Sequence, residues 1–526
     1  MRRIRPPARF VIPAGLILLV LGPQSAATQD RYELLWHRYL PDPIYTSLGM
    51  SVDAWSLFAG NYLNAPTQVE NLPILGDGTP TWVCPGRELY ADAGRATQVF
   101  AALDANPADS SVTVEEWSPG SATPLWSYRI HPCRPLTNDG WSQGKGIQVS
   151  DYGATIAVVV NMYDPDGLNG RLFVFDSGQP TPAIDYPLPD GTATALALTQ
   201  EGRFSAIYAW PYIYVYDCVA GQLRWSGSAG SGNDAIAISG DGRYIGWGWW
   251  TFYLRRWNGS TYEPIWSTTQ GGTYLISECA LDANNDLLAL GWYKNSTFDD
   301  TVIELYDLPS IAPRWSYHYE PVREDPGPER NPVDCPSEMV FDSPGGLLAV
   351  ASWGGSFPEI HVFQRELATP VLVHDTPGTM FDIDVVNDPG GSAYIAACGK
   401  HVHAGIAGRG GDLYALALMM GDAVEEPPAA GPVSRLARVY PNPIRTRATI
   451  DYRLDAGGPI RLTVHDLQGR TIATLVDAFV GGGEHAANWG GRDDAGRRVP
   501  PGVYLLRISA DGRTRTQRPL VLLDAR

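Results

Sequence analysis

The segment AIAISGDGRYIGWGWWTFYLRRWNGSTYEPIWS, residues 235–267, contains every part of the repeating unit that decides the fold. It begins with alternating apolar residues, passes through a Ser-Gly-Asp-Gly turn and continues into an apolar strand with small residues. A third strand and a fourth that ends in Trp266-Ser267 complete the unit. Residues 195–226 follow the same pattern and end in Trp225-Ser226, 41 residues earlier. Four short strands in a period of roughly 40 residues predict a series of small antiparallel sheets.

The opening of this unit recurs along the chain, from Cys279, Met339 and Phe381 and more faintly from Ile147. We therefore expect an all-β chain with a seven-bladed β-propeller over residues 31–420. The seven fourth strands are expected near Trp36, Trp126, Ile184, Trp225, Trp266, Trp315 and Leu372.

The last unit, which ends at residues 412–416, has no fourth strand of its own, whereas residues 33–37 (ELLWH) have the missing pattern. We expect this early strand to complete the last blade and close the ring, which would leave no open sheet edge. Because 90 residues separate Trp36 from Trp126, we also expect an insertion within residues 47–81.

The stretch DCVAGQLRWS, residues 217–226, resembles the blade motif of quinoprotein-alcohol-dehydrogenase-like propellers, and the turn before the second strand is similar to that of WD-repeat proteins. The resemblance implies the fold and leaves the activity open. Quinoprotein enzymes of that family clamp their cofactor with a pair of adjacent cysteines, and no two cysteines are adjacent here. We therefore expect no cofactor.

The first 27 residues have the three parts of a Sec signal peptide. Arg2, Arg3, Arg5 and Arg9 form a basic start, residues 10–21 are uncharged and apolar, and Ser25-Ala26-Ala27 supplies small residues for cleavage. The apolar run is short for a membrane span, and no later stretch is apolar enough to be one. We expect a bacterial protein that is secreted or held at the outer cell surface, with no transmembrane segment after signal removal.

Charge is distributed unevenly along the chain. Residues 30–432 carry twenty basic and forty-eight acidic residues, whereas residues 433–526 carry fifteen Arg and nine acidic residues. An acidic body repels a phosphate backbone, so nucleic acid is excluded as the expected partner.

The six cysteines all lie between residues 84 and 398, and their spacing excludes a C-x-x-C metal knuckle. An exported chain with an even number of cysteines is compatible with disulfides. We expect Cys279 and Cys335 to pair, because each precedes a predicted inner strand of neighbouring blades.

Residues 421–435 (GDAVEEPPAAGPVSR) form a predicted linker, and residues 436–526 a second domain of short alternating strands. Turns at residues 467–470 and 494–496 separate these strands, as in a small Ig-like β-sandwich.

Ordered motifs in this domain carry a second resemblance: YPNP at 440–443, HDLQGR at 465–470, Trp489, DDAG at 493–496 and PGVY at 501–504. Together they resemble the C-terminal sorting domain of type IX secretion substrates, which is related to the Ig-like domain of the flagellar hook-capping protein. The resemblance implies that residues 436–526 address the chain to the type IX secretion machinery. An accessory Ig-like module is the alternative.

The sequence contains no catalytic motif of the G-x-S-x-G, H-E-x-x-H or P-loop kind. Asp164, Asp166 and Asn169 have the spacing of calcium ligands, but they lack the downstream Glu of an EF-hand, so a capped turn is the expected structure. Cys398, His401 and His403 are compatible with a zinc or copper site or with a polar loop. We favour the loop.

Aligning the second strands places Trp210, Trp250, Tyr293 and Trp353 at equivalent positions in four consecutive blades. These strand ends are expected at the top face, near the channel. The aromatic side chains there are candidates for binding a glycan or protein ligand. Packing between the blades is the alternative.

These features favour a non-catalytic recognition propeller that is exported through its C-terminal domain. One alternative is an enzyme, either quinone-dependent or acting on polysaccharide, and another is a structural component of the cell envelope. An enzyme would be expected to gather carboxylates with shifted pKa values around the axis, whereas a binding protein would have an aromatic or polar rim.

Overall fold

The computed structural model describes residues 31–522 except 54, 63–66, 87–88, 137–145, 166, 190, 231–234, 283–285, 296–299, 320–334, 355–356, 388–391, 404–407, 420–433, 441–443, 445–446, 455–457, 466–470, 482, 501 and 511–512. The predicted signal peptide lies outside the described residues. Among the described residues, no helix is long and apolar enough to span a membrane. One 3₁₀ turn, η1 (Gln270–Gly272), accompanies the strands of this part of the chain.

Eight antiparallel sheets form the N-terminal part of the described chain, and we number them as blades 1–8 in order. Blade 1 contains β2 (Ile44–Ser51), β3 (Ser56–Tyr62), β4 (Gln68–Pro73) and β5 (Trp82–Pro85). Blade 2 contains β6 (Leu89–Ala93), β7 (Phe100–Asn106), β8 (Ser111–Trp117) and β9 (Trp126–Ile130). Blade 3 contains β10 (Cys133–Pro135), β11 (Ile147–Val149), β12 (Thr155–Asp164), β13 (Gly167–Asp176) and β14 (Ile184–Pro187). Blade 4 contains β15 (Thr192–Leu198), β16 (Phe204–Trp210), β17 (Tyr212–Asp217) and β18 (Gln222–Ser228).

The second half of the ring repeats this order of strands. Blade 5 contains β19 (Ala235–Ile238), β20 (Tyr244–Gly248), β21 (Phe252–Trp257) and β22 (Tyr262–Thr268). Blade 6 contains β23 (Tyr274–Leu281), β24 (Leu287–Lys294), β25 (Thr301–Asp307) and β26 (Pro313–His318). Blade 7 contains β27 (Pro336–Phe341), β28 (Leu347–Ser352), β29 (Ile360–Gln364) and β30 (Leu372–His374). Blade 8 contains β31 (Met380–Asn387), β32 (Ala393–Lys400), β33 (Gly411–Met419) and β1 (Arg31–Leu40).

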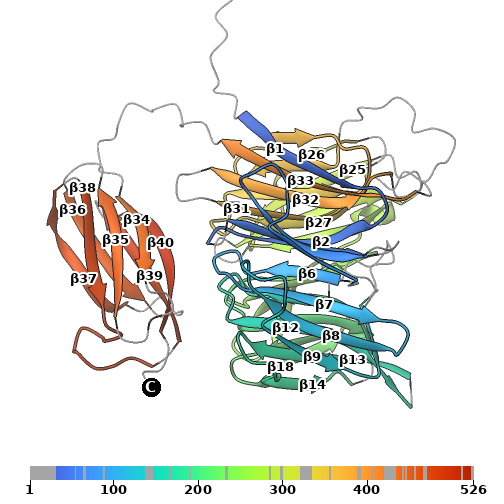
Figure 1. The fold of residues 1–526 in the computed structure, drawn as a ribbon, viewed down its shortest axis with the longest axis horizontal. Coiled ribbons are helices and arrows are strands. Elements are labelled where there is room, and N and C mark those ends of the chain that lie inside the picture. The colour runs from blue at the N-terminus through green and yellow to red at the C-terminus, as the bar shows by residue number, and fades with distance from the viewer. Residues whose placement is uncertain are drawn as a thin grey trace, which may run out of the picture.

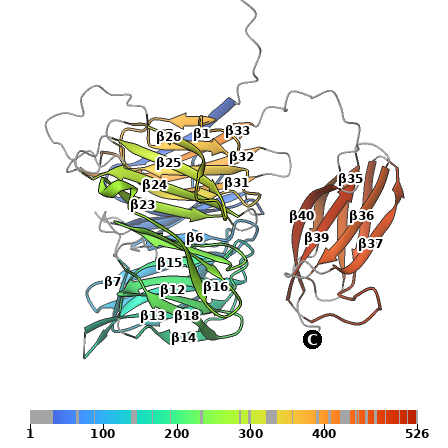
Figure 2. The ribbon, with the colours of Figure 1, turned by 180° about the vertical axis from the view of Figure 1, so that it is seen from behind.

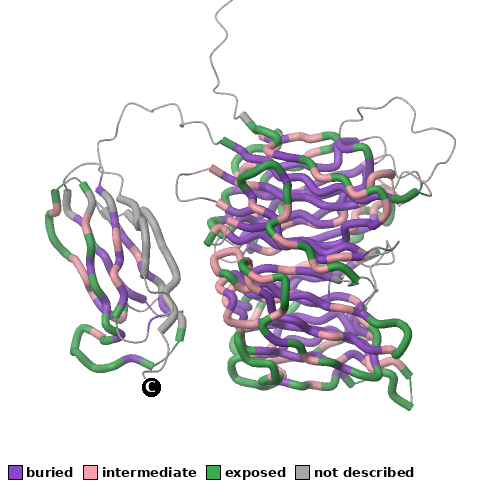
Figure 3. The backbone as a smooth tube through the Cα atoms, in the orientation of Figure 1, coloured by how far each residue is buried: buried purple, intermediate pink, exposed green. Residues whose placement is uncertain are grey.

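The eight sheets form a closed ring, which makes this part of the chain a β-propeller. The inner strands contact one another in the cycle β2, β6, β11, β15, β19, β23, β27, β31 and back to β2. Eight clusters of buried apolar side chains fill the described interfaces, each cluster shared by two consecutive blades. Figure 3 shows the strands of the ring as largely buried, with exposed residues mainly in the connections.

The prediction of seven blades is wrong, because the described part of the ring contains eight. The segment predicted as an insertion, residues 47–81, supplies most of β2, β3 and β4 of a complete blade, and β5 follows it. The prediction failed because β5 has the sequence WVCP and lacks the Trp-Ser pair that marks other outer strands.

The early strand closes the ring as predicted. β1 pairs antiparallel with β33, with Leu34 opposite Leu416, and Figures 1 and 2 show the two side by side. Two side chains of β1 also form hydrogen bonds to blade 1. The indole of Trp36 donates to the carbonyl of Ile74 (3.0 Å), and the guanidinium of Arg38 donates to the fully buried carboxylate of Glu70 (2.8 Å).

Polar side chains of the inner strands join several neighbouring blades. In each case a side-chain oxygen on one inner strand accepts a hydrogen bond from a backbone N–H of the next. Such a bond to a carboxylate contributes about 1.5–3 kcal/mol. The bonds run from Leu48 to Asp382 (2.7 Å), Met50 to Asp384 (2.9 Å), Val149 to Asp92 (2.7 Å) and Leu198 to Gln148 (2.6 Å).

The C-terminal strands form two further antiparallel sheets. One contains, in spatial order, β34 (Ser434–Tyr440), β35 (Ala448–Leu454) and β38 (Gly483–Trp489). The other contains β37 (Thr471–Val480), β36 (Gly458–His465), β39 (Gly502–Ala510) and β40 (Arg513–Leu522). Side chains from both sheets share one apolar core, which includes Tyr452, Leu462 and Trp489. The first strand begins at Ser434, inside the predicted linker of residues 421–435.

Candidate functional site

The strand register places the four predicted aromatic residues at equivalent positions. In each of the four blades, one inner-strand residue pairs with a residue of the second strand, and the aromatic residue follows two positions later in the chain. The aromatic residue therefore lies at the end of the blade where the inner strand begins. We call this end of the ring the top face. The reference pairs are Tyr208 with Ala195, Gly248 with Ala235, Gly291 with Glu278 and Ala351 with Glu338.

Exposure divides the four aromatic residues into two pairs. Trp210 is 51% and Trp250 is 43% exposed, whereas Tyr293 and Trp353 are buried. The buried pair shares a cluster with Leu275 and Cys335, and burial raises the pKa of Tyr293 to about 12. The predicted ring of four ligand-binding aromatics is therefore reduced to two, because Tyr293 and Trp353 pack into this cluster, with Trp249 and Phe381 against it.

Two further aromatic residues extend the exposed pair. Tyr212 begins β17, directly after Trp210 and Pro211, and is 38% exposed. The ring centres of Trp249 and Trp250 lie 5.4 Å apart in an edge-to-face arrangement, and the indole of Trp249 donates to Tyr293 (3.4 Å). The Trp-Pro-Tyr and Trp-Trp sequences were the available signals for these residues. We call Trp210, Tyr212, Trp249 and Trp250 the blade 4–5 aromatic surface.

A cavity of about 220 Å³ runs along the axis of the ring, between the inner strands. Its lining includes one guanidinium, that of Arg95, and six carboxylates from blades 2, 3, 6, 7 and 8: Asp92, Asp151, Glu278, Asp282, Glu338 and Asp384.

Arg95 crosses the axis at the end of the channel away from the top face. It follows β6 of blade 2, yet its side chain donates to Asp384 of blade 8 (2.8 Å) and to the carbonyl of Phe341 in blade 7 (2.9 Å). Burial lowers the pKa of Arg95, but the charges of Asp384 and Asp151 outweigh burial and raise it above its ordinary value. The guanidinium therefore ties together blades on different sides of the channel.

The carboxyl groups at this end have shifted pKa values. Burial raises the pKa of Asp151 to about 6, against the lowering effect of Arg95, and burial raises the pKa of Glu201 to about 7. Carboxylates with raised pKa values near an axial cavity are one feature expected of an enzyme. Several of the lining carboxylates, however, already bind backbone N–H groups or Arg95 and thus hold the blades together.

The candidate calcium loop is a hairpin between β12 and β13. Asp164 pairs with Gly167 in the strand register, and the amide of Asn169 donates to the carboxylate of Asp164 (3.2 Å). Asp166 lies outside the described residues. Among the described residues, no three His, Cys, Asp or Glu side chains are arranged to hold a metal ion.

The side chains of Cys398, His401 and His403 do not converge. Cys398 is buried in the core between blades 8 and 1. His401 instead shares the fully buried carboxylate of Asp412 with His37 of β1, at 2.9 Å and 2.7 Å. His403 faces Glu359, with Nδ1 3.8 Å from Oε1. Sequence spacing could not reveal the contact between His37 and Asp412, because ring closure creates it.

The predicted Cys279–Cys335 disulfide is wrong. All six cysteines lie in described residues, and the structure contains no disulfide among them. Cys279 turns towards blade 5, where Sγ lies 3.9 Å from the carbonyl oxygen of Gly246, whereas Cys335 packs against Trp353 at the top face. Burial raises the pKa of Cys133 and of Cys218 to about 11, so these thiols are poor nucleophiles.

No model of a known protein family matches the chain, and no curated protein matches it. Among solved structures, the chain is similar to the β-propeller domain of Cps50 (Swd1) from Myceliophteria thermophila, with 11% identity over 74% of this chain and 100% of that one and a TM-score of 0.41. It is also similar to Sqt1 from Saccharomyces cerevisiae, with 10% identity over 73% of this chain and 98% of that one and a TM-score of 0.48. The assignment of the propeller rests on the closed ring of sheets in this chain.

Proposed function

We propose that this chain is a secreted or cell-surface recognition protein whose propeller binds a saccharide at the blade 4–5 aromatic surface. The observation that carries the proposal is the exposure of two tryptophans, Trp210 and Trp250, at equivalent positions of adjacent blades. Large aromatic side chains are mostly buried in folded proteins, so paired exposed indoles call for an explanation. A flat indole face matches the apolar C–H face of a sugar ring, and its N–H and neighbouring hydroxyl groups bind the sugar's polar edge.

A glycan array of the mature chain tests this proposal. We expect a defined set of saccharides to bind wild-type protein, and the signal to fall at least about tenfold in Trp210→Ala and in Trp250→Ala. Val219→Ala is the matched control, because Val219 is 77% exposed but lies in the turn between β17 and β18, at the opposite end of these strands. An array on which no saccharide binds, or binding that both tryptophan variants retain in full, would refute the proposal.

The C-terminal domain supports the export part of the proposal. The strand order β34-β35-β38 and β37-β36-β39-β40 is compatible with an Ig-like sandwich. The hydroxyl of Tyr504 donates to the carbonyl of Pro500, four residues upstream (2.7 Å), as in the tyrosine corner of such domains. We propose that this sandwich is the type IX sorting domain that the motifs of residues 436–526 resemble.

Deleting residues 434–526 tests the export role in a bacterium that has type IX secretion. We expect the truncated chain to pass the inner membrane and accumulate in the periplasm, while the full chain reaches the cell surface or the medium. Surface delivery of the truncated chain at the level of the full chain would contradict the sorting role and favour an accessory module.

Asp151 lines the axial cavity together with Asp92, Asp282 and Asp384, and its raised pKa makes polysaccharide hydrolysis the second candidate function. Incubating each array ligand with the protein and measuring new reducing ends separates the two functions. Release of product that Asp151→Asn abolishes would favour the enzyme. Unchanged ligand favours recognition alone.

A further inference from the structure

Two arginines at the interface of blades 4 and 5 lie against aromatic rings instead of carboxylates. Arg255 of β21 places its guanidinium carbon 5.4 Å from the ring centre of Trp225 and 5.7 Å from that of Trp247. One of its N–H groups donates to the carbonyl of Tyr262 (3.1 Å), and its Nε is buried without a hydrogen-bond partner among the described residues. Burial lowers the pKa of Arg255, and no neighbouring charge opposes this shift.

Arg224 of β18 lies on the other side of the same interface. Its guanidinium carbon is 4.1 Å from the ring centres of both Phe204 and Trp257 and 5.5 Å from that of Tyr262. Its hydrogen-bond partner is the carbonyl of Gly242 (3.2 Å), and burial lowers its pKa despite the more distant charges of Asp217 and Asp241. Tyr262 touches both arginines, so the two guanidinium groups belong to one seam, which we call the blade 4–5 seam.

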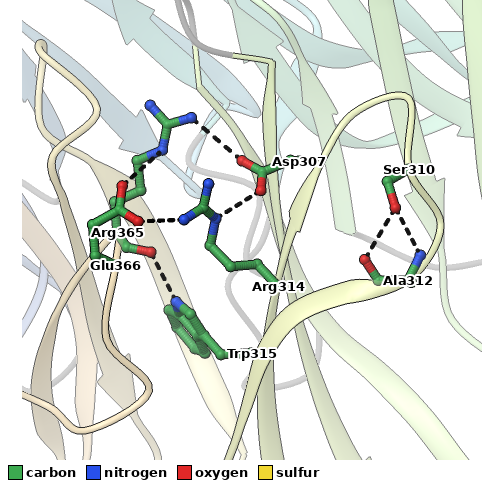
Figure 4. A network of polar contacts seen from close by, with 7 residues as sticks. All are labelled: Asp307, Ser310, Ala312, Arg314, Trp315, Arg365 and Glu366. Carbon is green, nitrogen blue, oxygen red and sulfur yellow. Dashed lines mark hydrogen bonds and ion pairs between the residues drawn. The ribbon is translucent and has the colours of Figure 1, made fainter.

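Most other described arginines of the propeller have carboxylate partners. Figure 4 shows the arrangement at blades 6 and 7, where Asp307 pairs with both Arg314 and Arg365, and Glu366 with Arg314. Arg134 and Arg256, which are also without an ion pair among the described residues, are exposed to water. The other paired arginines are Arg38, Arg95, Arg129, Arg171, Arg203, Arg243 and Arg409.

A half-buried cation without a counter-ion is costly, and in a body with forty-eight acidic residues it is unexpected. Stacking on aromatic rings recovers part of the lost hydration and leaves guanidinium N–H groups available. A planar guanidinium with free donors is the residue best suited to a carboxylate. The seam therefore has the chemistry to receive an anionic group.

The blade 4–5 seam leads away from the surface that the proposed function uses, and Arg224 lies at its far end, where it donates to Gly242 in the turn between β19 and β20. Trp250 lies just before β21, and Arg255 lies five residues further along, roughly 17 Å at the rise of an antiparallel strand. Between them, Tyr253 stacks on Trp247, with ring centres 5.6 Å apart. A short chain of sugar rings that starts on Trp250 can therefore reach Arg255.

We propose that the ligand is an acidic saccharide, whose sugar rings stack on the blade 4–5 aromatic surface and whose carboxylate pairs with Arg255 and Arg224. This inference rests on the proposed function and names its ligand class. The acidic body repels long polyanions, so the ligand is a short acidic oligosaccharide.

Calorimetric titration of the full mature chain tests the inference with galacturonate, glucuronate and mannuronate tetrasaccharides, each beside its methyl ester. The ester keeps the sugar ring and removes the charge. We expect at least one acid form to bind about tenfold more tightly than its ester, and Arg255→Gln to remove that difference. Arg256→Gln is the matched control, because Arg256 is the next residue on β21 and is exposed. Arg255→Lys, which keeps the charge, should retain part of the preference, and thermal unfolding of each variant shows whether it folds.

Equal binding of acid and ester forms, or a preference that survives Arg255→Gln in folded protein, would overturn the inference while leaving saccharide recognition intact. A polyglutamate peptide that bound more tightly than every uronate would overturn the saccharide class. Absence of binding to any uronate, with neutral sugars still bound through Trp210 and Trp250, refutes the acidic ligand alone. Loss of all saccharide binding refutes the proposed function as well.

Discussion

Replacing Arg38 with alanine should detach the strand that closes the ring. Arg38 lies on β1 of blade 8, and its guanidinium donates to Glu70 (2.8 Å) and to Tyr45 (3.2 Å), both of blade 1 and both fully buried. Removing one partner leaves a buried carboxylate without its counter-charge, which costs about 3–5 kcal/mol. Because the Arg38 side chain keeps 24% of its exposure, we expect the lower end, about 3 kcal/mol.

Hydrogen exchange followed by mass spectrometry measures this detachment directly. A loss of about 3 kcal/mol corresponds to a fall in the protection of β1 amides on the order of 100-fold. The triple variant Arg38→Met/Tyr45→Phe/Glu70→Met should recover most of the protection. It leaves no buried charge, and it also removes the buried hydroxyl of Tyr45, which bonds to both Arg38 and Glu70.

Arg409→Ala provides the control, since its ion pair with Asp42 is exposed and should contribute less than about 1 kcal/mol. If Arg38→Ala leaves the exchange of residues 31–40 as slow as in wild-type protein, the closure does not depend on this contact and the reasoning is wrong.

Other side chains of the ring give three more tests. His361 is buried and its pKa is lowered to about 3 by burial, whereas an unfolded histidine has a pKa of about 6.5. The unfolded chain therefore binds an extra proton below pH ~6.5, so stability should fall as the pH decreases from there towards 3. Melting temperatures of His361→Phe should depend less on acid pH than those of wild type. Equal acid sensitivity of the two proteins would contradict this. Arg95→Met removes the cation beside Asp384 and Asp151 and should destabilise the ring by about 3 kcal/mol. Without the Arg95 cation the pKa of Asp151 rises further, so its ionised carboxylate becomes more costly to bury. The loss of unfolding free energy, measured in urea, should therefore be larger at pH ~8 than at pH ~5. A loss that does not depend on pH would contradict this role of Arg95. Finally, all six cysteines should react with iodoacetamide in denaturant without reductant, as counted by intact mass, and any cysteine that reacts only after reduction would reveal a disulfide.

Repetition made the propeller predictable from the sequence. The inner-strand pattern of residues 195–198 and 235–238 marks β15 and β19, and residues 33–37 have the pattern of a missing outer strand that pairs with β33. Blade 1 was missed because a diverged repeat cannot be distinguished from an insertion by spacing alone. The acidic residues Asp382 and Asp384, placed in an otherwise apolar strand, were an available signal for bonds between blades.

The candidate site was only half predictable, because strand alignment gives position and not exposure. Trp210 and Trp353 occupy the same place in their blades, yet a cluster with Leu275, Tyr293 and Cys335 buries Trp353. The seam could not be predicted either, because Arg224 and Arg255 come together only when blades 4 and 5 pack against each other.

The most direct test of ligand recognition is calorimetric titration of the Trp210→Ala/Trp250→Ala double variant with a saccharide that binds the wild-type chain. Both side chains are exposed, so the variant should unfold at the wild-type temperature. We expect the affinity of the double variant to fall by at least about 100-fold, since each indole contributes on the order of 1.4 kcal/mol or more. Binding at wild-type affinity would show that the ligand contacts another part of the molecule.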